Sequence, residues 1–316
     1  MKKVFGASFT FVGTVIGAGF ATGQEINLFF GNCSVFSVLL AGILLGGFCY
    51  LFLKAGMLTK GKVLFYFGKF SPIIGGIVVI ANLAVFCTTL AGSEQVFYNL
   101  FGIRCGSVIT ALLTLIIVIF GFKQIKIVNT LIVPVIIALV LVIFFRDKSP
   151  ISTDGKFSFA QPFCYASMNV ITGGFVVSEI SSDFTEKQCV LSGLLTGLCL
   201  TAMLLAIYFP VKNVSEEMPL IVKATLLDLK VVGNVVLYLA MLTTLIGTLQ
   251  ATAKNSVYKK ILFSALGLLV SSVGFAELID KMYPVLGAIG GAVCIAFVIV
   301  YFAGNRSSRY CNPQCL

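Results

Sequence analysis

Long apolar segments recur along the whole chain, and the charged residues are confined to short clusters between them. Only 11% of the 316 residues are charged, whereas a soluble domain carries about 25%. A segment of about 18 or more apolar residues is long enough to cross the hydrocarbon core of a bilayer as a helix. The pattern predicts a polytopic membrane protein and excludes a soluble enzyme, a disordered chain and a secreted disulfide scaffold.

Charge clusters and Pro and Gly residues divide the chain into ten predicted helices of about 20 residues each. Helices satisfy their own backbone in lipid, whereas the strands of a barrel would alternate polar and apolar residues. The fold predicted is therefore all-α. The predicted spans are 4–30, 34–57, 72–100, 105–121, 124–145, 160–182, 188–210, 231–253, 258–275 and 282–303, and the amphipathic stretch 220–229 is expected to form a surface helix.

The basic residues indicate the orientation of these helices. With the N-terminus in the cytoplasm, most of the 22 Lys and Arg residues fall in cytoplasmic segments, including the clusters at 54–69 and 254–260. Because cytoplasmic loops carry an excess of Lys and Arg, both termini are predicted to be cytoplasmic. No stretch is basic enough to follow a phosphate backbone, so the net charge of +10 does not predict a nucleic-acid partner. The bilayer is the expected partner, and the oligomeric state is left open.

A shift of 155 positions aligns the chain with itself in three separate places. Residues 15–20 match 170–175, residues 35–45 match 190–200, and residues 88–95 match 243–250. Chance matches are common among apolar residues, but a shared offset that includes polar Thr, Ser and Gln positions favours a true repeat.

The repeat predicts two five-helix units, 1–146 and 160–305, joined by an external connection, 147–159, and followed by a cytoplasmic tail, 306–316. An odd number of passes inserts the second unit upside down relative to the first. This is the inverted repeat of secondary transporters, whose binding sites lie near the midplane.

Glycine-rich stretches interrupt the first helix of each predicted unit. The first helix contains Gly13, Gly17, Gly19 and Gly23, and the sixth contains the string 172–174. Gly costs about 1 kcal/mol relative to Ala in a helix, and an unwound turn in lipid must face protein, water or a ligand. Close packing through small residues is the alternative explanation. The matching positions in the two units favour discontinuous helices.

Broken helices expose backbone groups that can bind ligands. The new half-helix presents N–H groups with a partial positive charge, and the ended half-helix presents carbonyls with a partial negative charge. An anionic substrate group suits the first end and a small cation suits the second. We therefore expect a small-molecule substrate between the two breaks. The predicted substrate-binding residues are Gly17, Ala18, Gly19, Phe20, Thr172, Gly173, Gly174 and Phe175.

The string Gly13-x-x-x-Gly17-x-Gly19, followed by polar residues, resembles the first helix of the LeuT-fold, or amino acid–polyamine–organocation, superfamily. The fuller string 13–25 is most similar to the YkvI-type transporters of bacteria. The repeat extends the superfamily resemblance over essentially the whole chain. The resemblance implies a symporter in the bacterial cytoplasmic (inner) membrane that takes up an amino acid or a similar carboxylate-bearing solute by alternating access.

The resemblance also implies a sodium site between the first and eighth helices, formed by two carbonyls before the break and by a carbonyl and two hydroxyls on the eighth helix. The last three lie on one helix face, although Thr hydroxyls in membrane helices also bond back to their own helix. A second family site uses an Asn shortly after the break, where this chain has Phe20, so the resemblance implies one sodium ion. The matching residues are Gly13, Ile16, Ala240, Thr243 and Thr244.

Three acidic residues, Glu25, Glu94 and Glu179, lie inside predicted spans. An intramembrane carboxylate is costly and is therefore a functional candidate. Glu94 lies near the end of the third helix, where an interfacial role is preferred. Glu25 and Glu179 are roughly related by the repeat and could gate the two mouths of a transport path or carry a proton. The proton is thus the alternative coupling ion, and no other cofactor is expected.

Other functional classes fit the sequence less well. The main rival is a receptor of the same fold that binds a small solute without net transport, as the germination receptors of spore-formers do. No ring of charged residues or filter sequence favours a channel. The chain contains no histidine and no nucleophile–base set, so we predict no catalytic residues and no enzymatic activity. The ten cysteines lie mostly in apolar runs, where they behave as small hydrophobic residues.

Overall fold

The computed structural model describes residues 1–148, 155–212, 214, 216, 218–253, 256–271 and 275–307, and nearly all of them are helical. Residues 149–154 of the predicted connection and 308–316 of the predicted tail lie outside the described residues. The elements are α1 (Lys2–Val15), α2 (Ala18–Thr22), α3 (Gln24–Phe30), α4 (Val35–Leu58), the 3-10 helix η1 (Val63–Phe70), α5 (Ser71–Phe101), α6 (Gly106–Ile119), α7 (Phe122–Arg146), α8 (Ala160–Glu179), α9 (Glu186–Val211), α10 (Pro219–Leu226), α11 (Lys230–Ala253), α12 (Val257–Val270) and α13 (Phe275–Ser307).

Each predicted span overlaps at least one helix of the described residues, and α10 overlaps the predicted surface stretch 220–229. Six of the described segments are long and apolar enough to cross a membrane, namely Val35–Leu58, Val63–Phe101, Ile127–Arg146, Glu186–Val211, Lys230–Ala253 and Glu277–Ala303. The first, fourth, sixth and ninth predicted spans are not among the six, so ten passes remain a prediction. α6 and α12 are short, whereas α1 and α8 are mostly buried in the protein. Buried helices can carry the polar residues that lipid-facing helices exclude.

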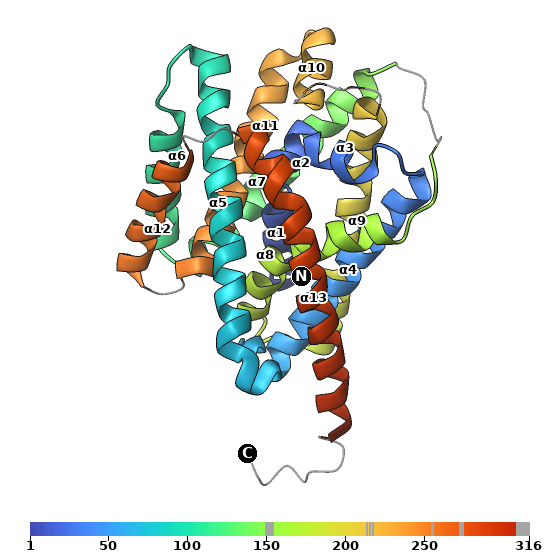
Figure 1. Cartoon of the computed structure of the whole chain (residues 1–316), viewed down its shortest axis with the longest axis vertical. Coiled ribbons are helices and arrows are strands. Elements are labelled where there is room, and N and C mark those ends of the chain that lie inside the picture. The colour runs from blue at the N-terminus through green and yellow to red at the C-terminus, as the bar shows by residue number, and fades with distance from the viewer. Residues whose placement is uncertain are drawn as a thin grey trace.

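The core is built around α1, which packs against α7, α8, α9 and α11. Figure 1 shows α5, α6 and α12 on one side of the molecule and α3, α4 and α9 on the other, with α13 crossing between them. Helices at equivalent positions of the two predicted units contact each other: α1 contacts α8, α4 contacts α9, α5 contacts α11, and α6 contacts α12. Contacts between equivalent helices are expected near the axis of an internal repeat.

α4 and α9 approach each other closely because glycines from both helices meet at their interface. A Cβ atom added at Gly46 would lie 2.8 Å from the Cα of Gly197 and 2.9 Å from the carbonyl oxygen of Gly193. Gly42 and Gly197, which the 155-residue shift aligns, both lie in this interface. Small residues allow two helix backbones to approach in this way. The two glycines that the repeat aligns therefore have the same role in packing α4 against α9.

We predict that Gly46→Ala destabilises the protein by about 1–3 kcal/mol, because the added methyl group would overlap the α9 backbone. The measurement is the thermal unfolding temperature of the purified protein in detergent. Gly47→Ala is the matched control, because Gly47 is exposed on the same helix and its added Cβ would meet nothing within 4 Å. Equal unfolding temperatures for the two variants would contradict the close α4–α9 contact.

The predicted break in the sixth helix is wrong, because α8 runs without interruption from Ala160 to Glu179. Its glycines serve packing instead. A Cβ atom at Gly173 would lie 3.3 Å from the ring of Phe11, and one at Gly174 would lie 3.0 Å from the ring of Phe52. Backbone groups within a continuous helix bond to one another. They are therefore not available to a substrate at 172–174.

Candidate functional site

The first predicted break is present in the structure, directly after α1. Ile16 has φ −75° and ψ 75°, and Gly17 has an extended backbone before α2 begins at Ala18. A second interruption follows at Gly23, whose φ of 81° separates α2 from α3. The glycine-rich string thus forms a short buried helix between two turns. The last turn of α1 is left with carbonyl groups that the helix does not use.

These carbonyls converge on a single hydroxyl of α11. The Oγ1 atom of Thr244 lies 3.2 Å from the carbonyl oxygen of Gly13, 3.3 Å from that of Thr14 and 3.2 Å from that of Ile16. Thr244 is only 1% exposed. A hydroxyl has one proton to donate, so it satisfies one of the three acceptors at a time. The result is a buried cluster of four oxygen atoms.

Three of the five predicted sodium ligands, Gly13, Ile16 and Thr244, therefore meet at this oxygen cluster. Thr14 joins them, although the sequence did not single it out. Thr243 instead donates to the carbonyl oxygen of Ala240, 2.9 Å away on its own helix. The sequence left open whether these Thr hydroxyls bond back to their own helix, and Thr243 does so. Thr244 faces the break.

A small closed cavity lies next to the oxygen cluster, with a volume of about 10 Å³. A cavity of roughly this size holds about one water molecule, and the residues that line it are all buried. Its walls come from the α1 break, α3, α5, α8, α11 and α13. The lining residues are Thr14, Val15, Gly17, Glu25, Val85, Met168, Asn169, Thr172, Thr244 and Tyr283.

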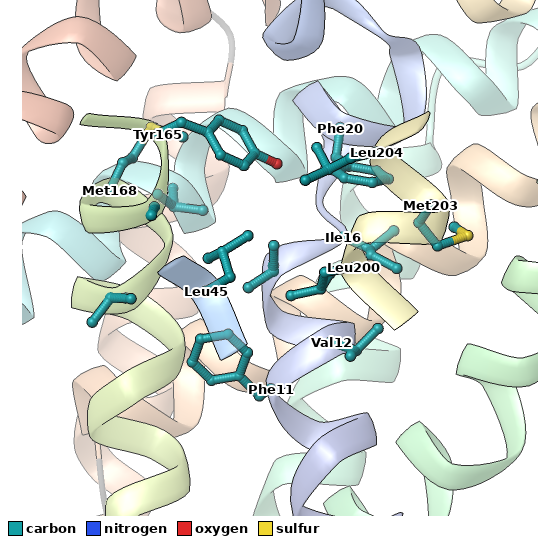
Figure 2. Packing of buried hydrophobic residues seen from close by; sticks show 14 of the residues in the cluster. Phe11, Val12, Ile16, Phe20, Leu45, Tyr165, Met168, Leu200, Met203 and Leu204 are labelled. Carbon is teal, nitrogen blue, oxygen red and sulfur yellow. The ribbon is translucent and has the colours of Figure 1, made fainter. Parts of the chain in front are cut away.

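Glu25 places a carboxylate in the wall of this cavity and is 2% exposed. The amide nitrogen of Asn169, on α8, donates to its Oε1 atom at 3.3 Å. The hydroxyl of Tyr165 lies close to the same carboxylate, and Figure 2 shows the Tyr165 ring extending from α8 toward the segment that carries Ile16 and Phe20. Among the described residues, no Lys or Arg forms an ion pair with Glu25.

The other predicted substrate residues divide into two groups. Gly17 and Thr172 line the cavity, and Gly19 borders it, since a Cβ atom there would lie 2.8 Å from Oε2 of Glu25. The remaining predicted substrate residues do not line it. Ala18 and Phe20 are fully buried in the hydrophobic core, Gly173 and Gly174 pack against rings, and Phe175 makes an edge contact with Phe52.

Glu179 lies apart from Glu25, at the end of α8. It lines a second cavity of about 410 Å³ together with Lys62 and residues of η1, including Val63. Glu94 accepts hydrogen bonds from the backbone and hydroxyl groups of Ser107 at the start of α6, both at 2.8 Å, and its interfacial role stays a prediction.

Sequence reasoning missed several residues at the site. Tyr165, Met168 and Tyr283 gave no polar signal in apolar helices, and Asn169 was not among the predicted site residues. Its spacing from Thr172 was a usable signal, because residues at i and i+3 share a helix face. Asp280 accepts a hydrogen bond from the side-chain amide of Gln24 at 3.1 Å and thereby joins α13 to α3.

No family model matches the chain. The chain is 26% identical to YkvI, an uncharacterized membrane protein of Bacillus subtilis strain 168, over 92% of its own length and 93% of that protein. Among solved structures it is similar to Mhp1, a nucleobase-cation-symport-1 family transporter in a closed conformation with bromovinylhydantoin bound, with a TM-score of 0.63 and 12% identity over 94% of this chain and 77% of that one.

The chain is also similar to MhsT in complex with L-phenylalanine, with a TM-score of 0.60 and 16% identity over 90% of this chain and 86% of that one. A manganese transporter of Eremococcus coleocola gives a TM-score of 0.56 and 15% identity over 95% and 77% of the two chains. The Mhp1 and Eremococcus coleocola structures are titled as transporters. The chain is therefore a multi-pass membrane protein with the LeuT fold, and it resembles YkvI over nearly its whole length, as residues 13–25 predict.

Proposed function

We propose that the protein is an ion-coupled secondary transporter of a small organic solute, working by alternating access. The observation that carries this proposal is the buried oxygen cluster of Thr244 with the carbonyls of Gly13, Thr14 and Ile16, which lies beside a closed cavity. Two of the solved structures of similar fold are titled as transporters, one of them of a nucleobase-cation-symport family, which supports the proposal.

Sodium is our first choice of coupling ion. Hard cations prefer oxygen ligands, and broken transporter helices supply them as unwound carbonyls. In the oxygen cluster, three carbonyls compete for one hydroxyl proton. A bound cation would interact with all three carbonyls and remove this competition. A proton carried by Glu25 or Glu179 is the second choice, because both carboxylates line cavities of the described structure.

The substrate we propose is an amino acid or a similar small carboxylate-bearing compound. Since α8 is continuous, backbone recognition would come from the α1–α2 break at Gly17, Ala18 and Gly19, and α8 would contribute the side chains of Asn169 and Thr172 instead. MhsT was solved with L-phenylalanine and Mhp1 with a hydantoin, so the same fold accommodates solutes of this size.

The membrane arrangement we propose is the ten-pass inverted repeat, in the bacterial cytoplasmic membrane with both termini inside. Contacts between helices related by the 155-residue shift support it. In this orientation the cavity beside Glu179 and η1 lies on the cytoplasmic side of the central cavity. It would form part of the inner mouth of the path, and opening and closing there would alternate with opening on the outer side.

Reconstitution tests the proposal directly. A panel of solutes is first screened for thermal stabilisation of the purified protein with and without Na⁺, and the stabilising solutes are then supplied to proteoliposomes that carry an inward Na⁺ gradient. We expect accumulation above the external concentration that collapses when the gradient is dissipated. Accumulation driven by a pH gradient alone would select the proton. Binding without accumulation would favour the rival function, a receptor of the same fold.

A further inference from the structure

We propose that Glu25 binds a cationic nitrogen of the substrate, so that the protein selects small solutes with a free ammonium group. This inference rests on the proposed function and narrows its substrate class. The evidence is the position of the carboxylate, which is almost fully buried and forms part of the wall of the cavity beside the oxygen cluster.

The charge of Glu25 has no counterpart within the described protein. Its polar neighbours are the Asn169 amide, which donates at 3.3 Å, and the nearby Tyr165 hydroxyl, and both are neutral donors. A carboxylate removed from water needs both hydrogen bonds and an opposite charge to offset its desolvation. The Asn169 amide supplies a hydrogen bond, and the opposite charge is left to an occupant of the cavity.

The surroundings of the carboxylate suit an organic cation better than a second metal ion. An alkali ion requires several oxygen ligands, whereas the walls beside Glu25 include the apolar side chains of Val85 and Met168 and the ring of Tyr283. The Tyr283 ring and Oε2 of Glu25 both lie within 3 Å of the position that a Cβ atom of Gly19 would occupy. A carboxylate beside an aromatic ring forms an ion pair and a cation–π contact with an ammonium group.

The two charged subsites would then lie in one cavity. Thr244 and Gly17 form its wall on the side of the oxygen cluster, and Glu25 and Asn169 form another part of the wall. A sodium ion at the oxygen cluster would favour an anionic group nearby, and Glu25 would favour the ammonium group. A zwitterionic solute satisfies both demands. A solute without a cationic nitrogen would leave Glu25 unpaired when the cavity closes.

The test uses matched compounds on four carbon skeletons: L-alanine, L-valine, L-leucine and L-phenylalanine, their N-acetyl derivatives, and the amines formed by their decarboxylation. Each is assayed for thermal stabilisation of the purified full-length protein in the presence of NaCl. We expect free amines on at least one skeleton to stabilise the protein and the N-acetyl derivative of that skeleton to have no effect. Stabilisation by none of the free amines, or equal stabilisation by the N-acetyl derivatives, overturns the proposal.

Substitution of the carboxylate is the second arm. Glu25→Gln should weaken binding of the stabilising amine at least tenfold, and Glu25→Asp should weaken it less, because the charge is kept but withdrawn by one methylene group. Glu94→Gln is the matched control, since Glu94 caps α6 outside the cavity, and it should bind normally. If Glu25→Gln does not fold, the Glu25→Asp variant and the comparison with the N-acetyl derivatives still test the proposal. Unchanged amine binding by a folded Glu25→Gln variant overturns the proposal.

The outcomes separate this inference from the transport function. Binding of amines that depends on Glu25, without accumulation in proteoliposomes, would reject transport and keep the inference. Sodium-driven accumulation of an amine-free solute, unaffected by Glu25→Gln, would keep transport and reject the inference. A Glu25→Gln variant that binds the amine normally but loses uptake driven by a pH gradient would assign Glu25 to proton coupling and reject it as well.

Discussion

Replacing Thr244 with Ala is expected to raise the Na⁺ concentration that half-saturates solute uptake by at least about tenfold, or to abolish the dependence on Na⁺ altogether. The substitution removes the one side-chain oxygen that meets the carbonyls of Gly13, Thr14 and Ile16. The carbonyls alone would form a more open and less complete shell for a cation. Uptake into proteoliposomes at graded external Na⁺ measures the effect.

The neighbouring threonine provides the control. Thr243→Ala should have a much smaller effect, because the Thr243 hydroxyl bonds to Ala240 of its own helix, and Thr244→Ser should restore most of the Na⁺ dependence because it keeps the hydroxyl. Thr243 and Thr244 are both buried, so a general loss of packing would affect both Ala variants alike. Unchanged sodium dependence in Thr244→Ala would remove the sodium assignment.

Gly23→Ala is expected to destabilise the protein by about 2–5 kcal/mol, the sum of two separate effects. Gly23 has a φ of 81° between α2 and α3, a left-handed conformation that disfavours a residue with a Cβ atom. The added Cβ atom would also lie 2.8 Å from Cγ1 of Val211 and 3.1 Å from Cγ of Pro219. The thermal unfolding temperature and the yield of monodisperse protein in detergent report the loss.

Gly102→Ala separates the two effects. Gly102 ends α5 with a similar φ of 69°, but its added Cβ atom would meet nothing within 4 Å. It should therefore lose only the conformational part, about 1–2 kcal/mol. The difference between the two variants measures the contact of the α2–α3 turn with α9 and α10. Equal losses would show that the backbone angle alone accounts for the requirement for Gly23 and that the contact contributes little.

The sequence predicts the class of the protein and the position of its helices because both depend on local properties. Apolar length and charge clusters identify the membrane segments, and α10 follows from an amphipathic stretch. The break in the first helix also depends on local sequence. The string from Gly13 to Gly23 combines glycines, which weaken a helix, with polar residues that are unfavourable in an apolar helix.

What the sequence could not decide is which neighbours each residue meets. Gly173 and Gly174 look like the glycines of the first helix, but Phe11 and Phe52 pack against them and α8 is continuous. A glycine-rich string can unwind or can pack closely, and only the opposing surface selects between these outcomes.

The candidate site shows the same division. Spacing placed Thr243 and Thr244 together on the eighth helix, and only the packing of α11 against α1 directs Thr244 to the break and leaves Thr243 on its own helix. Hydropathy marked Glu25 as costly, and the fold brings Asn169 from α8 to its carboxylate across 144 residues of sequence. Composition and periodicity act within one segment and therefore determined the elements, whereas the oxygen cluster and the paired walls of the cavity arise from contacts between distant segments, which only the tertiary structure decided.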